Sequence, residues 1–312
     1  MDIIKAKIDV VFKMLFTRDN DVLRAFVGDI LDMPRGSIQN IHVENPNILP
    51  YVYDGKQSQL DLRMSVDNKI VNVEIQLYNE GNFPERSLYY WSKMYADELK
   101  SGEDYSKLKR TICINILNFK LFDCDSAYSK FMLLEESRYE LLTDKCAIMF
   151  LELVKIDDQI DANDRKKLWL QLIKAETKEE LDMLEKTGVP EIKKAVVILH
   201  EMSADEEARE MARLREKAIL DHNSAINFAT NKGIAIGEEI GEKRGLAKGK
   251  AEGRAEGRAE GRAEGRAEGR AEGRAEGRAE GKAEGRAEER EARIVRMRQK
   301  GYTEEQIRDI FE

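Results

Sequence analysis

The stretch Leu60–Leu77, LDLRMSVDNKIVNVEIQL, decides how the rest of this sequence is interpreted. Apolar and polar residues alternate on both sides of Asp67-Asn68-Lys69, a sequence typical of a tight turn. The pattern predicts a β-hairpin with its polar side chains on one face and its apolar side chains on the other. Asp61, Glu74 and Gln76 would then converge on the polar face.

Two acidic side chains placed in this way suit a hard divalent cation. Asp61 and Glu74 offer carboxylate oxygens, which are the ligands that Mg²⁺ prefers in proteins. Such an ion can activate water and stabilise the charge that develops on a phosphodiester. Spacing alone favours the alternative, a solvated hairpin face with alternating charge. The motifs around the hairpin strengthen the metal-site interpretation.

Composition narrows the class of protein. The chain has 312 residues, with 52 basic and 60 acidic side chains and a net charge of −8. This balance is not that of a general DNA-binding protein, although an enzyme that acts on DNA needs only a local basic groove. The character of the chain changes after about residue 230, and the part before this point is long enough for one sizeable core.

The patterns of cysteine, histidine and apolar residues argue against a disulfide scaffold, a zinc site and a membrane-spanning helix. The three cysteines are few and not in metal-binding spacing, which favours a reducing cytoplasm over a disulfide scaffold. The three histidines are isolated, so sequence neighbours build no zinc site. No apolar stretch approaches the roughly 18 residues of a membrane-spanning helix. We therefore expect a cytoplasmic protein with no membrane partner, and no nucleotide cofactor.

The segments outside the hairpin predict an α/β core followed by helices. Apolar spacing in the first half indicates helices at 3–16, 20–31 and 84–100. Strand-like runs occupy 38–42, 110–119 and 147–156. The chain then becomes helical near 162–175, 177–186, 189–202 and 204–230. Ser203 is the expected N-cap of the last of these helices.

A tetrapeptide array follows, in which glycine recurs every four residues from Gly233 and Ala-Glu-Gly-Arg repeats over 251–286, with lysine in place of arginine at position 282. Glycine inside a helix costs about 1 kcal/mol relative to alanine, so an isolated helix here should be marginal. The array is either a spacer, helical or frayed, or a self-associating rod such as a coiled coil. Thr303 to Gln306 form an expected capping box for a short last helix. The predicted domains are 1–230, 231–293 and 294–312.

Five passages, taken in order, resemble the recombination-promoting nuclease / transposase family of the PD-(D/E)XK nuclease superfamily. They are IDVVFKMLF at 8–16, LDL at 60–62, VEIQ at 73–76, LYYWSK at 88–93 and LKSGEDY at 99–105. The order helix, strand, hairpin, helix, strand also matches that core. The likeness covers roughly residues 3–230. It implies a restriction-endonuclease-like fold, a mixed sheet flanked by helices.

The resemblance also implies DNA cleavage that depends on Mg²⁺ or Mn²⁺, and a link to recombination. Asp61 and Glu74 would hold the metal, and the Ile75 backbone carbonyl would be a further ligand. Gln76 stands where the wider superfamily has lysine, so it can orient water but adds no positive charge. Asp9 would be an accessory acid of the N-terminal helix.

Basic side chains suggest how DNA would bind. Arg86, Lys93 and Lys100 are spaced by seven and predict a basic stripe on the helix after the hairpin. Lys13 lies one turn from Asp9 and could contact phosphate or pair with that acid. The alternative to cleavage is a catalytically weak or inactive nuclease-like protein that binds DNA or assembles, forming a homo-oligomer through its repeat tail.

Overall fold

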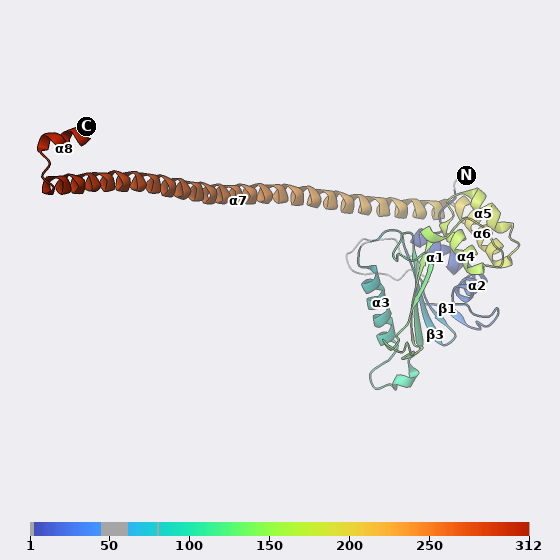
Figure 1. Ribbon diagram of the computed structural model, residues 1–312. Coiled ribbons are helices and arrows are strands. Elements are labelled where there is room, and N and C mark those ends of the chain that lie inside the picture. The colour runs from blue at the N-terminus through green and yellow to red at the C-terminus, as the bar shows by residue number, and fades with distance from the viewer. Residues whose placement is uncertain (1–2, 45–61, 80, 312) are drawn as a thin grey trace. The chain divides into compact units, whose positions relative to one another are not determined.

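The computed structural model describes residues 3–44, 62–79 and 81–311, and within them the chain forms a mixed β-sheet (Figure 1). The strand order is β1-β2-β3-β4-β6-β5. β1, β2 and β3 are antiparallel, β3, β4 and β6 are parallel, and β5 is antiparallel to β6. The bounds of the strands are β1 Ile41–Val43, β2 Leu62–Val66, β3 Lys69–Gln76, β4 Arg110–Leu117, β5 Tyr128–Phe131 and β6 Cys146–Glu152.

The predicted hairpin is present as β2 and β3. The two strands pair from Leu62↔Val73 to Val66↔Lys69, which leaves a two-residue loop. Asp67 adopts a left-handed backbone with φ of 48°, a conformation that acidic and amide side chains tolerate in tight turns. Its carboxylate accepts hydrogen bonds from the backbone N–H groups of Gln39 (3.0 Å) and Asn40 (2.8 Å). These bonds tie the turn to the segment that precedes β1.

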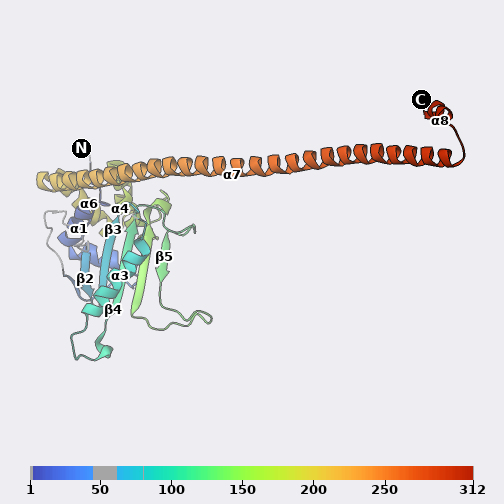
Figure 2. The same ribbon diagram turned by 90° about the vertical axis from the view of Figure 1, so that its left-hand side faces the viewer.

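Helices cover the two faces of the sheet unequally. One face carries α1 (Asp9–Arg18) and α2 (Asn20–Ile30), with α4 (Arg165–Lys174), α5 (Lys178–Glu185) and α6 (Pro190–Ala204) completing the same apolar core. The other face carries α3 (Phe83–Asp97), which Figure 2 shows lying in front of the sheet. Successive side chains of a strand point to opposite faces of the sheet, so neighbouring residues of one strand pack in different apolar cores.

An aromatic cluster holds the larger helical layer together. The cluster consists of Phe12 and Phe16 of α1, Phe26 of α2 and Trp169 of α4, and the centroids of neighbouring rings lie between 4.4 and 6.0 Å apart. All four side chains are fully buried. The indole N–H of Trp169 donates to the carboxylate of Asp29 at 2.7 Å, so the polar end of the ring is satisfied. This cluster fixes α1 against the sheet that carries the hairpin.

Several element bounds differ from the sequence expectation. The first helix begins at Asp9 and not near residue 3. Strand β5 was not predicted, because its four residues form a short edge strand with little alternation. Ser203 lies inside α6, where its hydroxyl donates to the Leu199 carbonyl and accepts from the Ile4 N–H. Asp205 takes the expected capping role, with its carboxylate accepting from the Ala208 N–H at 2.8 Å.

The chain divides into two compact units, residues 1–224 and 225–312, and helix α7 (Glu206–Gln299) begins in the first and continues through the second. Within the first unit, Ala208 and Ala212 of α7 are buried, and Lys5 pairs with Glu216 at 3.0 Å. Among the described residues, no helix is long and apolar enough to cross a membrane.

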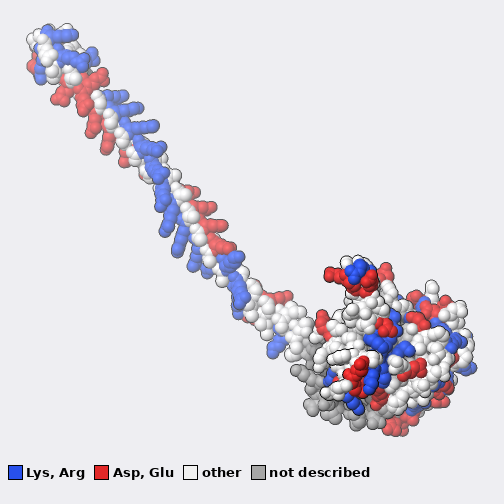
Figure 3. Space-filling view, turned by 90° about the horizontal axis from the view of Figure 1, so that it is seen from below, with Lys and Arg blue, Asp and Glu red and all other residues white. Residues whose placement is uncertain are grey.

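The second unit is a single helix with a short helix folded against its end. The repeat array is helical throughout, and Figure 3 shows its basic and acidic rows winding around the axis. The rows wind because four residues exceed one turn of 3.6 residues. After Gly301, whose φ is 91°, α8 (Glu304–Phe311) begins with the predicted capping box between Thr303 and Gln306. Ile307 of α8 is buried.

Replacing Gly257, Gly261 and Gly265 together with alanine should strengthen α7. An added Cβ meets no atom within 4 Å at any of these positions, and alanine is favoured over glycine by about 1 kcal/mol per residue inside a helix. Circular dichroism at the helical band should show melting of the array at higher temperature in the full-length variant. Gly301→Ala is the matched control and should loosen the end of the tail, because its left-handed backbone disfavours a side chain. An unchanged melting curve for the triple variant would contradict a helical array.

Candidate active site

Glu74 lies near the carboxyl end of β3, on the face of the sheet that α3 covers. Val73 belongs to the larger apolar core on the opposite face, as does Ile75. Only 9 % of Glu74 is exposed. Gln76 follows two residues later, so the period of the strand places it on the same face as Glu74. The third predicted member of this face, Asp61, lies outside the described residues.

Within the part of the chain that the structure describes, the carboxylate of Glu74 has few partners for a buried charge. The side-chain amide of Asn72 donates to it over a long 3.4 Å. The amide oxygen of Asn72 is itself buried and finds no hydrogen-bond partner among the described residues. Burial raises the pKa of Glu74, while the nearby charge of Arg86 and the Asn72 bond oppose that shift. Burial therefore disfavours the charged form of Glu74, and Asn72 and Arg86 oppose this effect.

Gln76 is held by a residue of α3. The Arg86 guanidinium donates to the Gln76 side-chain oxygen at 2.7 Å. Among the described residues, the nitrogen of the same amide makes only a long contact, 3.4 Å, with the Tyr78 carbonyl. The guanidinium also lies 4.6 Å from the centre of the Phe83 ring, a cation–π contact. The amide of Gln76 is thus oriented by a charged hydrogen bond, and the nitrogen is its less engaged end.

Buried polar groups extend from Glu74 across β4. Asn115, the register partner of Glu74, donates to the Met149 carbonyl at 3.0 Å and accepts from the Ser87 hydroxyl of α3 at 3.2 Å. Burial, together with the charge of Glu74, raises the pKa of the Cys113 thiol. Asn115 was not among the site residues predicted from the sequence. The sequence feature that could have pointed to Asn115 is an amide inside the apolar run of residues 110–119, because a buried amide requires hydrogen-bond partners.

The predicted residues of α1 lie in a different setting. Asp9 forms an ion pair with Arg215 of α7, whose Nε lies 2.8 Å from both carboxylate oxygens. An accessory role for Asp9 would require this pair to open or to share its charge. Lys13, one turn further along α1, is half-buried. The side chain of Ile75 packs in the apolar core, so only its backbone is available to a site on the polar face.

The predicted basic stripe is not a single helical face. The helix ends at Asp97, so Lys100 lies beyond it in the turn that leads to Gly102, whose φ is 86°. Placing Lys100 on the helix was therefore wrong, because the chain leaves the helix before the glycine turn. Lys93 is exposed on α3, whereas Arg86 is half-buried and contacts Gln76. The three cations thus occupy three different settings.

The side chains around Glu74 supply some of the oxygen ligands that Mg²⁺ requires. No group of three or more His, Cys, Asp or Glu side chains is gathered within residues 3–44, 62–79 and 81–311. Glu74 supplies one carboxylate, and the orphaned amide oxygen of Asn72 lies in the same buried patch. Oxygen donors of this kind fit a hard cation. The predicted second carboxylate is that of Asp61, which lies outside these ranges.

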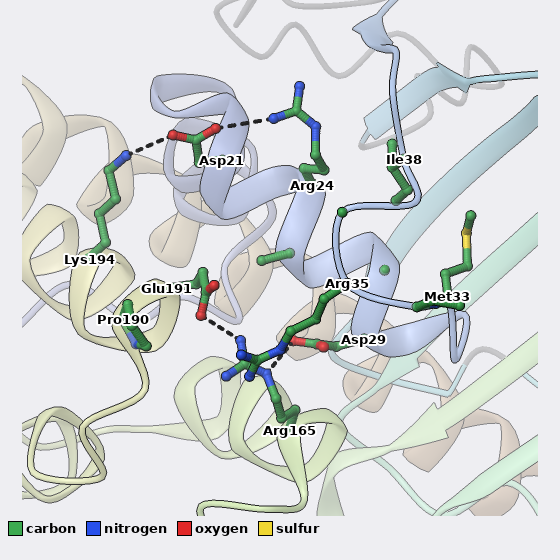
Figure 4. Close-up of a pocket in the computed structure, with 14 residues that line it drawn as sticks. Asp21, Arg24, Asp29, Met33, Arg35, Ile38, Arg165, Pro190, Glu191 and Lys194 are labelled. Carbon is green, nitrogen blue, oxygen red and sulfur yellow. Dashed lines mark hydrogen bonds and ion pairs between the residues drawn. The ribbon is translucent and has the colours of Figure 1, made fainter.

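A separate pocket of about 420 Å³ lies among α2, the loop that follows it and the starts of α4 and α6 (Figure 4). Its charged side chains are largely paired with one another. Lys194 pairs with Asp21 at 3.4 Å, and Arg165 pairs with Asp29 at 3.1 Å and with Glu191 at 2.6 Å. The pocket contains none of the predicted site residues. We therefore place the candidate active site under α3.

The raised pKa of Glu74 makes a prediction for stability. Between the usual glutamate pKa of 4.5 and the raised value, the folded chain binds more protons than the unfolded chain, so wild type loses stability as pH rises through this window. Glu74→Gln does not titrate there. Its stability relative to wild type should therefore rise as the pH increases above the usual glutamate pKa of 4.5, as followed by denaturant unfolding. Glu85→Gln, at an exposed position of α3, is the control. A difference between Glu74→Gln and wild type that does not depend on pH would contradict the assigned environment.

Comparison with known proteins identifies the fold family. The profile of the PD-(D/E)XK nuclease family transposases matches residues 6–229. No curated protein and no solved structure matched the chain. The matched segment contains the mixed sheet and the helices on both of its faces, and it covers more than half of the 312 residues. The chain therefore belongs to the PD-(D/E)XK nuclease family transposases, with the restriction-endonuclease-like fold expected from its motifs.

Proposed function

We propose that this protein is a divalent-metal-dependent DNA endonuclease that hydrolyses phosphodiester bonds. Membership of the family supports the coarser statement, a link to nucleases and mobile elements. The observation that carries the finer one is the burial of Glu74 on the polar face of β3, two residues before Gln76 and beneath α3. A buried carboxylate without a strong partner is the setting in which a cation binds most favourably.

The metal ligands in this proposal are Asp61, Glu74 and the Ile75 carbonyl. Mg²⁺ or Mn²⁺, when bound, supplies Lewis acidity and an activated water. Asp9 is the accessory acid, and its pairing with Arg215 regulates how much charge it contributes. Glu74 and Asp61 fix the position of the ion relative to the strand, and the enclosure under α3 limits the entry of bulk water.

The remaining polar side chains position the substrate. Gln76 presents its amide nitrogen, the less engaged end, so it orients an oxygen of water or phosphate as a donor. Lys13, Arg86, Lys93 and Lys100 contact the DNA backbone and carry no sequence information. The products expected from this arrangement are a 5′-phosphate and a 3′-hydroxyl. The protein acts in the cytoplasm without a nucleotide cofactor.

The alternative function is that of a nuclease-like protein that binds DNA or assembles without cutting. Three observations favour it. Gln76 carries no charge, Asp9 is already paired with Arg215, and the net charge of the chain is −8. In this alternative the repeat array provides the assembly, and the protein is a homo-oligomer.

Nicking of supercoiled plasmid DNA with Mg²⁺ or Mn²⁺ separates the two functions. Glu74→Gln and Asp61→Ala should each lose at least about 100-fold in nicking rate, because each removes a metal ligand worth several kcal/mol. Glu85→Gln removes an exposed carboxylate of the neighbouring helix and should leave the rate unchanged.

The pattern of losses decides between the two functions. Equal nicking by wild type and Asp61→Ala would remove the assigned site. Absence of nicking in every variant and in wild type would favour the alternative.

A further inference from the structure

Arg86 is anchored more firmly than a surface cation that waits for DNA. Its guanidinium lies over the ring of Phe83, which is buried and packs edge-on against Phe119 and Phe150. The side chain is only partly exposed. An arginine fixed by a buried aromatic ring loses less rotamer freedom when it makes a further contact. The position of its charge is therefore set by the fold.

Two polar residues of β3 share this charge. Arg86 donates to the Gln76 side-chain oxygen at 2.7 Å, the length of a charge-assisted hydrogen bond. Its charge also acts on Glu74 and opposes the effect of burial on the pKa of that residue. Glu74 and Gln76 are two positions apart on one strand, a distance of about 7 Å. One guanidinium of α3 thus serves both residues of the strand that the proposed reaction uses.

A phosphodiester under attack by water gains negative charge that the site must offset. Lysine at position 76 would supply a positive charge from the strand itself, and Gln76 does not. Arginine is permanently charged and has the donor geometry that suits phosphate oxygens. The charge that the strand lacks is therefore available from the adjoining helix, at hydrogen-bond distance from the residue that replaces the lysine.

We propose that Arg86 is the cation of the candidate site: it holds Gln76 in place and supplies to the scissile phosphate the positive charge that Gln76 lacks. This inference rests on the proposed cleavage reaction, and it assigns Arg86 a role different from that of Lys93 on the same helix. Lys93 is exposed on α3. In the proposed function it contacts only the DNA backbone.

Magnesium affinity tests this inference without cleavage. Arg86→Gln should bind Mg²⁺ about tenfold more tightly than wild type in calorimetry, because a neighbouring positive charge that repels the ion is removed. Arg86→Lys keeps the charge and should bind Mg²⁺ with the affinity of wild type. This variant is measured in place of Arg86→Gln if Arg86→Gln does not fold. Lys93→Gln is the matched control and should change the Mg²⁺ affinity less than about twofold. A purely structural Arg86 predicts unchanged or weaker Mg²⁺ binding by Arg86→Gln, and this result would overturn the inference.

Relocating the charge tests the same inference in catalysis. Arg86→Gln should reduce plasmid nicking at least about 100-fold. Adding Gln76→Lys to Arg86→Gln restores a cation on the strand and should recover at least about tenfold of that loss. A double variant no more active than Arg86→Gln alone would overturn the role of the charge.

The outcomes separate this inference from the proposed function. If wild type nicks DNA and Arg86→Gln behaves like Lys93→Gln, the inference fails and the nuclease function stands. If wild type binds Mg²⁺ but does not nick DNA, the nuclease function fails, and tighter Mg²⁺ binding by Arg86→Gln still supports Arg86 as the cation of the site. If wild type does not bind Mg²⁺, both are overturned.

Discussion

The enclosure of a carboxylate between a sheet and a helix is the constraint on which the rest of this structure depends. Ionised Glu74 has lost most of its water beneath α3, and a buried charge is costly unless it is paired. Asn72 and Arg86 offset part of that cost, and neither forms a short hydrogen bond to Glu74 of the kind that Arg86 makes to Gln76. A divalent cation satisfies the same need more fully. The burial that makes ionised Glu74 costly is thus the feature on which the proposed metal site depends.

The scaffold makes this burial possible by separating its two faces. On one face, Phe12, Phe16, Phe26 and Trp169 pack helices against the sheet and contribute much of the apolar burial that stabilises the domain. On the other face, a single helix covers a smaller apolar core with a strip of buried polar groups beside it. The stable face allows the second face to carry residues that stability alone would not select.

Prediction from the sequence succeeded where the signal is local. The hairpin follows from period-two alternation around Asp67, and the capping box before α8 follows from Thr303 and Gln306. The contacts that define the candidate site were not accessible in this way. Arg86 reaches Gln76 only because α3 crosses the sheet, and the pairing of Asp9 with Arg215 joins residues 206 positions apart. The spacing of Arg86, Lys93 and Lys100 predicted three equivalent cations on one helical face. In the structure each of the three lies in a different environment.

The proposed function requires a divalent cation on the polar face of β3. Crystals of the full-length protein soaked in Mn²⁺ provide the most direct measurement, since anomalous scattering locates the ion without reference to activity. We expect an anomalous peak about 2.1 Å from a carboxylate oxygen of Glu74, with Asp61 as a second ligand. Diffraction that places Mn²⁺ elsewhere, or a fully occupied ion with no contact to Glu74, would contradict it.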